Sequence, residues 1–188
     1  MNEKTATPDD RDYDQRILEI HQELGVPEHY AHDRGLRLFE EALSLVTAEV
    51  DTNGKVHRLT EKTSTLWKRM KYAATKDGIH LILVSGFRDV DYQVGLIRKK
   101  LDQGKSIDDI LKVLAAPGFS EHHTGRAIDL TSPDCPPCTE RFEHTDAFAW
   151  LNMHAREFGF SMSFPRGNRH GFIYEPWHWA FHDSSEFL

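Results

Sequence analysis

Apolar residues recur at helical spacing in several stretches of this chain, and this pattern predicts most of its helices. The predicted helices cover residues 9–24, 60–76, 89–104, 106–115 and 145–158. Thr60 is a suitable capping residue for the second of them, and Gly25-Val26-Pro27 ends the first. Residues 36–50 form a further stretch of periodic apolar positions, which the turn sequence Asp51-Thr52-Asn53-Gly54 closes.

Three short apolar runs predict strands between these helices. The first, residues 80–85, lies between Gly78 and Gly86, and the other two cover residues 127–131 and 172–175. A few separated strands among many helices favour the α+β class. No linker of distinct composition divides the chain, so we expect a single domain over residues 1–188.

The composition is ordinary for a soluble globular protein, and the charge disfavours some partners. Of the 188 residues, 39% are hydrophobic and 28% are charged, and the net charge is -7 with no long basic run. This argues against nucleic acid or an anionic membrane surface as the main partner. No apolar stretch approaches the ~20 residues that span a bilayer. Residues 1–10 do not resemble a secretory signal, which predicts either a cytoplasmic protein or one that works in the cell envelope after a leader has been removed.

The chain has two cysteines, Cys135 and Cys138, in the sequence Asp-Cys-Pro-Pro-Cys. Two thiols are too few for a four-cysteine zinc site, and the two prolines stiffen the turn. A thioredoxin-like redox role requires such a motif where a strand meets a helix. We therefore favour a rigid surface loop, with or without a local disulfide.

Two motifs carry the candidate chemistry: Ser-Glu-His-His-Thr-Gly-Arg-Ala-Ile-Asp at 120–129 and Glu-Pro-Trp-His-Trp at 175–179. They supply two imidazoles and one carboxylate as potential metal ligands, and a second carboxylate near the last imidazole. Three protein ligands that leave a fourth position open for water are typical of hydrolytic zinc sites. Asp129 lies in a predicted buried strand, where a carboxylate needs a partner. That partner is either a metal ion or a basic side chain.

Glu175 and His178 are three residues apart, but Pro176 disfavours a helix at Glu175, so this is not a helical zinc-protease motif. We expect a strand that ends and turns a corner, with His178 as a ligand and Glu175 beside it. The alternative is a surface acid and a packed histidine. From the residues alone, His123 competes with His122 as the other imidazole ligand.

Arg88 follows the first predicted strand, at the end of the sequence Ser-Gly-Phe-Arg. Loops that follow strand ends often carry functional residues. A guanidinium there can hold a carboxylate or a developing oxyanion, and the alternative is a structural salt bridge.

Together these segments resemble, in order from about Leu59 to Trp179, the VanY-type zinc D-alanyl-D-alanine carboxypeptidases. The resemblance rests on the residues at 85–88, 117–122 and 175–179 and on Gln93, Gly125, Ala127 and Asp129. It implies the fold shared by lysostaphin-like peptidases, these carboxypeptidases and the hedgehog signalling domain, which is a small antiparallel sheet that carries a zinc site and is surrounded by helices. Residues 58–188 would form the catalytic core, preceded by a helical N-terminal segment, residues 1–57, outside the match.

The resemblance also implies roles for individual residues. The metal ligands are His122, Asp129 and His178. The catalytic residues are Glu175 and Arg88. The residues that bind substrate are Ser120, Gln93 and Arg88. His122 is chosen because the family's histidine lies two residues after the serine, and Glu175 takes the place of the catalytic base. The implied cofactor is one zinc ion, and the implied reaction removes a C-terminal D-alanine from a peptidoglycan stem peptide or muropeptide. We expect a monomer without nucleic acid and without a transmembrane segment.

Three alternatives remain. The first is a neighbouring specificity on muropeptides, namely an L,D-carboxypeptidase, a D,D-dipeptidase or a stem-peptide endopeptidase. The second is a zinc-containing peptidoglycan-binding domain without turnover, against which the intact Glu175 argues. The third is a structural protein without metal, in which the motifs coincide by chance.

Overall fold

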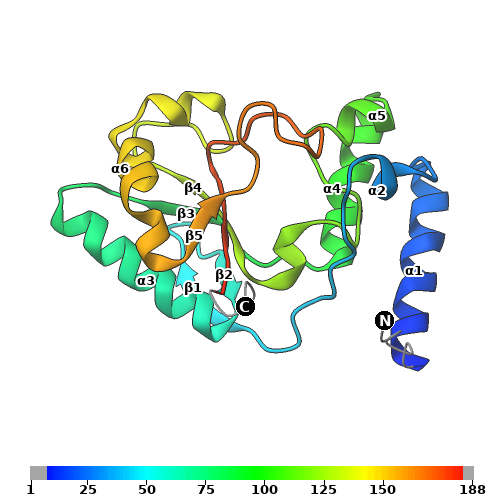
Figure 1. Ribbon diagram of the computed structural model, residues 1–188, viewed down its shortest axis with the longest axis horizontal. Coiled ribbons are helices and arrows are strands. Elements are labelled where there is room, and N and C mark those ends of the chain that lie inside the picture. The colour runs from blue at the N-terminus through cyan, green and yellow to red at the C-terminus, as the bar shows by residue number, and fades with distance from the viewer. Residues whose placement is uncertain (1–7, 184–188) are drawn as a thin grey trace.

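A four-stranded antiparallel β-sheet lies in the middle of the fold, with helices at both sides, and a two-stranded antiparallel sheet accompanies it (Figure 1). The structure is a computed structural model and describes residues 8–183. The α-helices are α1 (Pro8–Leu24), α2 (Tyr30–Asp33), α3 (Glu61–Lys76), α4 (Val90–Asp102), α5 (Ile107–Ile110) and α6 (Asp146–His154), and the short 3₁₀ helices are η1 (Glu121–Thr124), η2 (Glu140–His144) and η3 (Ala155–Phe158). The strands are β1 (Val46–Val50), β2 (Val56–Leu59), β3 (Ile82–Ser85), β4 (Ala127–Thr131), β5 (Phe160–Met162) and β6 (His178–Phe181).

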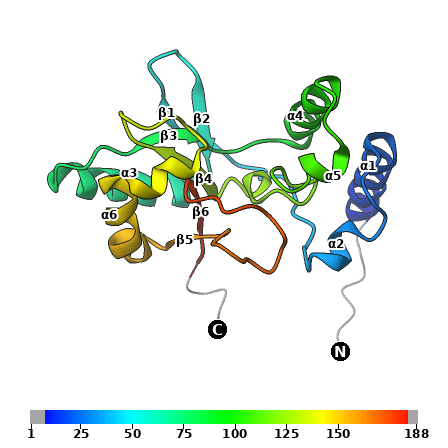
Figure 2. The same ribbon diagram turned by 90° about the horizontal axis from the view of Figure 1, so that it is seen from above.

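The larger sheet has the strand order β3-β4-β6-β5, and all neighbouring strands are antiparallel. Strand β6 therefore lies between β4 and β5, although it follows both in the sequence. Every residue of β4 and β6 is buried, so these strands form the middle of the sheet. The strands β1 and β2 form a separate hairpin, which projects from one side of the molecule in Figure 2. The small antiparallel sheet among helices confirms the predicted α+β class.

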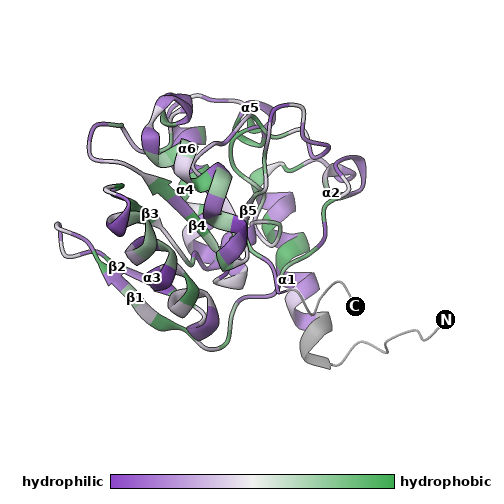
Figure 3. Cartoon of the chain, turned by 60° about the vertical axis from the view of Figure 1, so that its left-hand side comes forward, coloured by the Kyte–Doolittle hydropathy of each residue, from purple (hydrophilic) through white to green (hydrophobic). Residues whose placement is uncertain are grey.

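Two clusters of buried apolar residues hold the helices against this framework. The first lies between the larger sheet, α3 and α6 and contains Trp67, Ile128 and Trp150. The second packs α1 against α4 and α5 and contains Ile17 and Val94. Figure 3 shows the apolar residues around β3 in the interior and polar residues on the outer turns of α3. The N-terminal helix α1 therefore shares a core with helices that follow the first strand of the larger sheet.

Most of the predicted helices are confirmed. The predictions at 9–24, 60–76, 89–104 and 145–158 correspond to α1, α3, α4 and α6 with η3. The side chain of Asp89 caps α4, since it accepts a hydrogen bond from the backbone N–H of Tyr92 at 2.7 Å. The prediction at 106–115 was too long, because α5 is a single short helix. Within residues 8–183, no helix combines the length and the apolar character that crossing a lipid bilayer requires.

The N-terminal part of the chain is less helical than predicted. Within the described residues, the predicted helical segment 1–57 is helical only as far as α2, and residues 36–45 are extended up to strand β1. In Figure 1 this stretch runs from α2 across the molecule to the hairpin. The backbone N–H groups of Phe39 and Ala42 donate to carbonyl groups of the segment 118–123, so they do not close helical turns.

The strand predicted at 172–175 is absent, whereas β5 and β6 were not predicted. The Asn168 side chain explains the first error. Its Oδ1 accepts hydrogen bonds from the N–H groups of His170 and Phe172 at 3.2 and 3.3 Å, and its Nδ2 donates to Phe172 O at 2.8 Å. These side-chain bonds close a loop and compete with sheet pairing. The strand begins only at His178, two residues after Pro176.

The Cys135–Cys138 loop follows β4 and contains two free thiols. Cys135 is buried, Cys138 is exposed, and no disulfide joins them. The hydroxyl of Thr131 donates to the carbonyl of Cys135 at 2.8 Å and so ties the loop to the strand. The structure thus has a loop at this position, without the local disulfide.

Candidate metal centre

One row of residues across the larger sheet brings the candidate site together. Ser85 of β3 lies opposite Asp129 of β4, and Asp129 lies opposite His178 of β6. Directly opposed residues in antiparallel strands have Cβ atoms about 4.5–5.5 Å apart. The register therefore brings the Asp129 carboxylate and the His178 imidazole into contact, although 49 positions separate them in the sequence. The chain leaves β3 beside Asp129, which brings Arg88 to the same place.

His122 reaches this row from the 3₁₀ helix that leads into β4. Gly125 ends this helix in the left-handed conformation, with φ 63°, and a Cβ atom there would lie 2.9 Å from Leu45 Cδ2. The imidazole is fixed on the other side by Gly86, whose carbonyl accepts a hydrogen bond from His122 Nδ1 at 2.6 Å. A Cβ atom at Gly86 would lie 2.7 Å from Arg58 O. Both glycines are therefore required to bring the backbone close enough for His122 to face Asp129.

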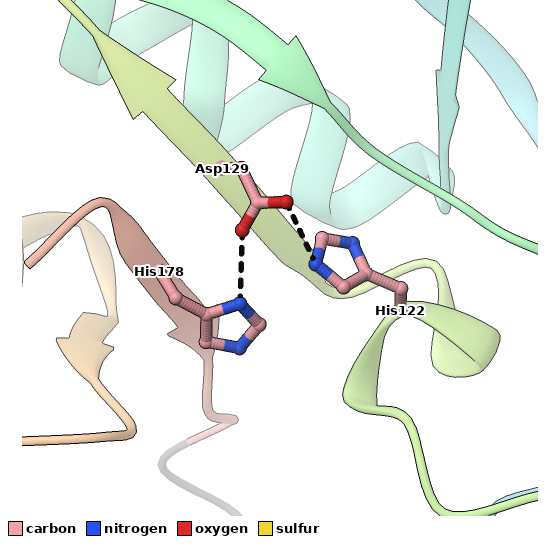
Figure 4. Close-up of side chains that lie close together, drawn as sticks. All are labelled: His122, Asp129 and His178. Carbon is pink, nitrogen blue, oxygen red and sulfur yellow. Dashed lines mark hydrogen bonds and ion pairs between the residues drawn. The ribbon is translucent and has the colours of Figure 1, made fainter. Parts of the chain in front are cut away.

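The side chains of His122, Asp129 and His178 converge on one point (Figure 4). The two oxygens of Asp129 separate the imidazoles: Oδ2 lies 3.2 Å from His122 Nε2, and Oδ1 lies 3.0 Å from His178 Nδ1. All three residues are buried, and one potential ligand atom of each lies within 4.8 Å of the others. This is a geometry in which a single metal ion can contact all three.

A buried ring nitrogen of His122 faces the Asp129 carboxylate and has no hydrogen-bond partner within residues 8–183. Burial, and then the nearby Arg88 guanidinium, lowers the pKa of His122 to about 4, so the ring is neutral near pH 7. Its proton is on Nδ1, which donates to a carbonyl, so Nε2 carries a lone pair that faces the Asp129 carboxylate. This Nε2 is buried and has no hydrogen-bond partner among the described residues. A cation bound between these two atoms, 3.2 Å apart, would satisfy both of them.

His123 is occupied by the backbone and has no free nitrogen for a metal. Its Nδ1 donates to Arg88 O at 2.6 Å, and its Nε2 accepts a hydrogen bond from Gly118 N at 3.1 Å. Burial lowers the pKa of His123, which is consistent with a neutral ring that makes these two bonds. The two neighbouring histidines thus differ in their surroundings: His123 ties the loop to the chain around Arg88, and His122 faces the carboxylate.

Glu121 is a residue of the site that the sequence interpretation missed. Its Oε2 accepts hydrogen bonds from His178 Nε2 at 2.8 Å and from the Ser163 hydroxyl. A carboxylate on Nε2 turns the ring so that Nδ1 faces Asp129. Burial alone would raise the pKa of Glu121, but the contact with His178 lowers it to about 2. The position next to His122 is the only sequence signal, and it does not reveal a contact 57 positions away.

Glu175 lies immediately before the turn that leads into β6, and the side chain is buried. Burial raises the pKa of Glu175 to about 7, although the nearby His178 opposes the shift. A carboxyl group with such a pKa both accepts and releases protons near neutral pH. No hydrogen bond or ion pair within residues 8–183 engages its carboxylate. The turn itself is fixed, because Trp179 Nε1 donates to Pro176 O at 2.9 Å.

A small cavity of about 30 Å³ lies beside these groups, and six of the predicted residues line it: Arg88, Gln93, Ser120, His122, Glu175 and His178. Arg88 Nη2 is 3.4 Å from Asp129 Oδ2, and the buried Nε of Arg88 has no partner among the described residues. Gln93 Nε2 donates to Ala115 O at 2.8 Å, and its buried Oε1 is likewise unpaired. Arg88 and Gln93 thus line the cavity, and each has one buried polar side-chain atom without a partner among the described residues.

A family model matches most of this sequence. The model is that of VanY, described as D-alanyl-D-alanine carboxypeptidase, and it matches residues 56–184. YodJ of Bacillus subtilis (strain 168), which is named as a carboxypeptidase, is 33% identical over 119 residues, or 59% of this chain and 41% of YodJ. The chain spans about half the length of the curated relatives it matches.

Solved structures with the same fold include two peptidases. An LdcB LD-carboxypeptidase, whose structure is described as revealing the molecular basis of peptidoglycan recognition, has 28% sequence identity and a TM-score of 0.67 over 75% of this chain and 69% of that chain. A VanY D,D-pentapeptidase in complex with Zn(II) has 23% identity and a TM-score of 0.56 over 77% of this chain and 86% of that chain. The second likeness concerns the fold alone.

Proposed function

This chain belongs to the VanY family of D-alanyl-D-alanine carboxypeptidases, and on that premise we propose that it is a zinc-dependent carboxypeptidase that removes a C-terminal D-alanine from peptidoglycan stem peptides. In this proposal, His122, Asp129 and His178 hold one zinc ion, and Glu175 is the catalytic base. The substrate class is supported by the relatives, since the solved LdcB enzyme is described by its recognition of peptidoglycan.

The convergence of three buried ligand atoms, with His122 Nε2 unpaired, is the observation that carries the proposal. Tetrahedral zinc with bonds of about 2.0–2.1 Å needs ligand atoms about 3.3 Å apart. The three potential ligand atoms lie within 4.8 Å of one another, so small side-chain movements would bring them to that spacing. Two imidazoles and one carboxylate suit zinc better than calcium or magnesium, which prefer oxygen ligands. Zinc in such a site polarises a carbonyl group and lowers the pKa of a bound water molecule from 15.7 to about 7.

The residues around the cavity supply the rest of the reaction. Glu175 accepts a proton from the attacking water and passes it to the leaving amine of the D-amino acid. The unpaired Nε–H of Arg88 donates to the oxyanion that develops on the scissile carbonyl, a kind of contact often worth about 3 kcal/mol. The unpaired Oε1 of Gln93 accepts from a substrate N–H group and so orients the peptide. Ser120, which lines the same cavity, adds a hydroxyl for this purpose.

The proposal is tested by incubating the zinc-loaded protein with a panel of peptides. The panel contains a muropeptide that ends in D-Ala-D-Ala, one that ends in a single D-Ala after an L-centre, and free D-Ala-D-Ala. Mass spectrometry of the products should show the loss of one terminal D-alanine from the first. A chelator should abolish this loss and added zinc should restore it. If zinc-loaded protein cleaves none of the three, the proposal is wrong and a binding domain without turnover is favoured.

An L,D-carboxypeptidase is the second candidate function. It is favoured by one observation, the likeness to the LdcB LD-carboxypeptidase at 28% identity and a TM-score of 0.67. The proposed ligands and base would serve both reactions, because the two substrates differ in the stereocentre that precedes the cleaved bond. The same panel separates them, since an L,D-enzyme cleaves the muropeptide with a single D-Ala and leaves the D-Ala-D-Ala ending intact.

Glu121→Ala should weaken zinc binding by about 10- to 100-fold, the range found when a partner of a metal-bound histidine is removed. The change takes away the carboxylate that holds His178 Nε2, so the ring is free to turn Nδ1 away from the metal. Competition with a chromophoric chelator measures the zinc Kd. Glu28→Ala, at an exposed position outside the site, is the matched control. An unchanged Kd in Glu121→Ala would mean that the hydrogen bond does not orient the ligand.

A further inference from the structure

The extended segment 35–42, here called the strap, lies outside the part of the chain that matches the VanY family, residues 56–184. The strap is nevertheless attached to the candidate site. Phe39 N donates to Gly118 O at 2.7 Å, and Ala42 N donates to His123 O at 2.8 Å. The strap is therefore bonded along the stretch of chain that carries the first proposed metal ligand, His122.

Two larger cavities open along the strap, and the larger of them adjoins the small cavity at the site. One has a volume of about 400 Å³ and the other about 270 Å³, and Arg37, Phe39, Glu121 and His182 line both. The larger one also shares Glu121, Phe164 and Phe172 with the small cavity of about 30 Å³. The larger cavity, here called the groove, thus lies along the strap and next to the small cavity at the potential metal ligands. The larger cavity has a volume in the range of ligand-binding pockets.

The larger cavity is cationic, although the protein as a whole has a net charge of -7. Its lining includes Arg37 from the strap and Arg169 from the loop that follows β5, and both are exposed. The Arg37 guanidinium lies 4.9 Å from the centre of the Phe39 ring, which steadies it without neutralising it. Among residues 8–183, no carboxylate pairs with either guanidinium. The one acid in the lining, Glu121, is already bonded to the imidazole of the site.

We propose that this groove binds the part of the substrate on the N-terminal side of the cleaved bond, and that Arg37 and Arg169 recognise a carboxylate on that part. The inference rests on the proposed carboxypeptidase function. Such an enzyme has a single residue beyond the cleaved bond, so the longer part of the peptide needs an open groove that leads away from the metal. Two guanidinium groups without a carboxylate partner among residues 8–183, beside aromatic side chains, suit an anionic peptide, since each can bind a carboxylate with two hydrogen bonds; Arg169 uses only its Nε, which donates to His170 Nε2 at 3.3 Å. The strap would then add substrate selectivity from outside the matched region.

The test compares two peptides that share the bond the enzyme cleaves best and differ only in one charge. One peptide carries a free side-chain carboxylate on the N-terminal side of that bond, and in the other this carboxylate is amidated. The wild-type protein should prefer the anionic peptide in kcat/KM. The double variant Arg37→Ala/Arg169→Ala should reduce this preference by about tenfold or more, through KM, as expected when charge-assisted hydrogen bonds are lost. Arg69→Ala, an exposed arginine of α3 outside the groove, is the control and should keep the preference.

A binding measurement tests recognition of the carboxylate without any need for peptide cleavage. The anionic product peptide, which lacks the terminal residue, is titrated by calorimetry. Its Kd should be about tenfold weaker for the double variant than for the wild type. A double variant with lysine in place of alanine at position 37, Arg37→Lys/Arg169→Ala, should recover part of the lost affinity. Equal preference ratios in wild type and double variant, or equal Kd values, would overturn the proposal. Failure of the wild type to cleave any peptide would contradict the carboxypeptidase function instead, and the calorimetry would still decide whether the groove binds the anionic peptide.

Discussion

Replacement of Glu175 by glutamine is expected to lower kcat/KM for the preferred muropeptide by at least two to three orders of magnitude while one zinc ion stays bound per chain. Loss of a general base typically costs a factor of about 10²–10⁴. Glutamine has nearly the same shape but cannot accept a proton from water at neutral pH. Because Glu175 is not among the three converging ligands, the metal content should not change.

The measurement for Glu175→Gln combines single-turnover kinetics with metal analysis by mass spectrometry. Single-turnover conditions isolate the chemical step from product release, which is the step that the base should control. The control is Glu28→Gln, which changes an exposed acid outside the site and should leave both readouts unchanged. Turnover within a few-fold of the wild type would show that another group takes the proton. Loss of zinc with the activity would show that Glu175 is a ligand and not the base.

His178→Ala is expected to remove zinc and all measurable hydrolysis. In the proposed site the imidazole is one of three protein ligands, and its loss also leaves the carboxylates of Asp129 and Glu121 without their shared partner. Zinc that binds the folded state stabilises it, so chelation should lower the melting temperature of the wild type. In His178→Ala the same chelator should have no effect, because no zinc is held.

Metal content per chain and thermal melting with and without chelator measure the effect of His178→Ala. His144→Ala removes an exposed histidine of η2 and is the matched control; it should bind one zinc ion and respond to the chelator as the wild type does. A full equivalent of zinc in His178→Ala would move the metal site elsewhere in the chain. Circular dichroism of both variants separates loss of metal from loss of fold.

The helices of this protein were predictable because their signals are local. Asp89 caps α4 with its side chain, whereas Thr60 precedes α3 without the predicted capping hydrogen bond; in both helices apolar residues recur at helical spacing. The strand β6 was missed because His-Trp-Ala-Phe is buried on both faces and so lacks the alternation that identifies a half-buried strand. The false strand at 172–175 had the right composition, but the Asn168 side chain bonds both backbone groups of Phe172, and the N–H groups of residues 173 and 175 donate to carbonyls outside the sheet.

The candidate site was predictable where it lies in short motifs and not where it depends on tertiary contacts. The structure brings His122, Asp129 and His178 together and leaves His123 bonded to the backbone, as the family motif implied. The contact of Glu121 with His178 depends on the sheet register, which no local pattern encodes. The groove was not predictable either, because its position depends on where the strap, which carries no sequence motif, crosses the molecule.

The position of β6 has a consequence for the order in which the protein folds. Residues 122 and 129 emerge from the ribosome about 50 residues before His178, and β5 has no partner in the sheet until β6 inserts beside it. Contacts of such long sequence separation form late, because closing the intervening loops costs entropy. The metal pocket and the sheet are therefore completed by the same event. Zinc uptake by a growing chain should report that this last strand has docked.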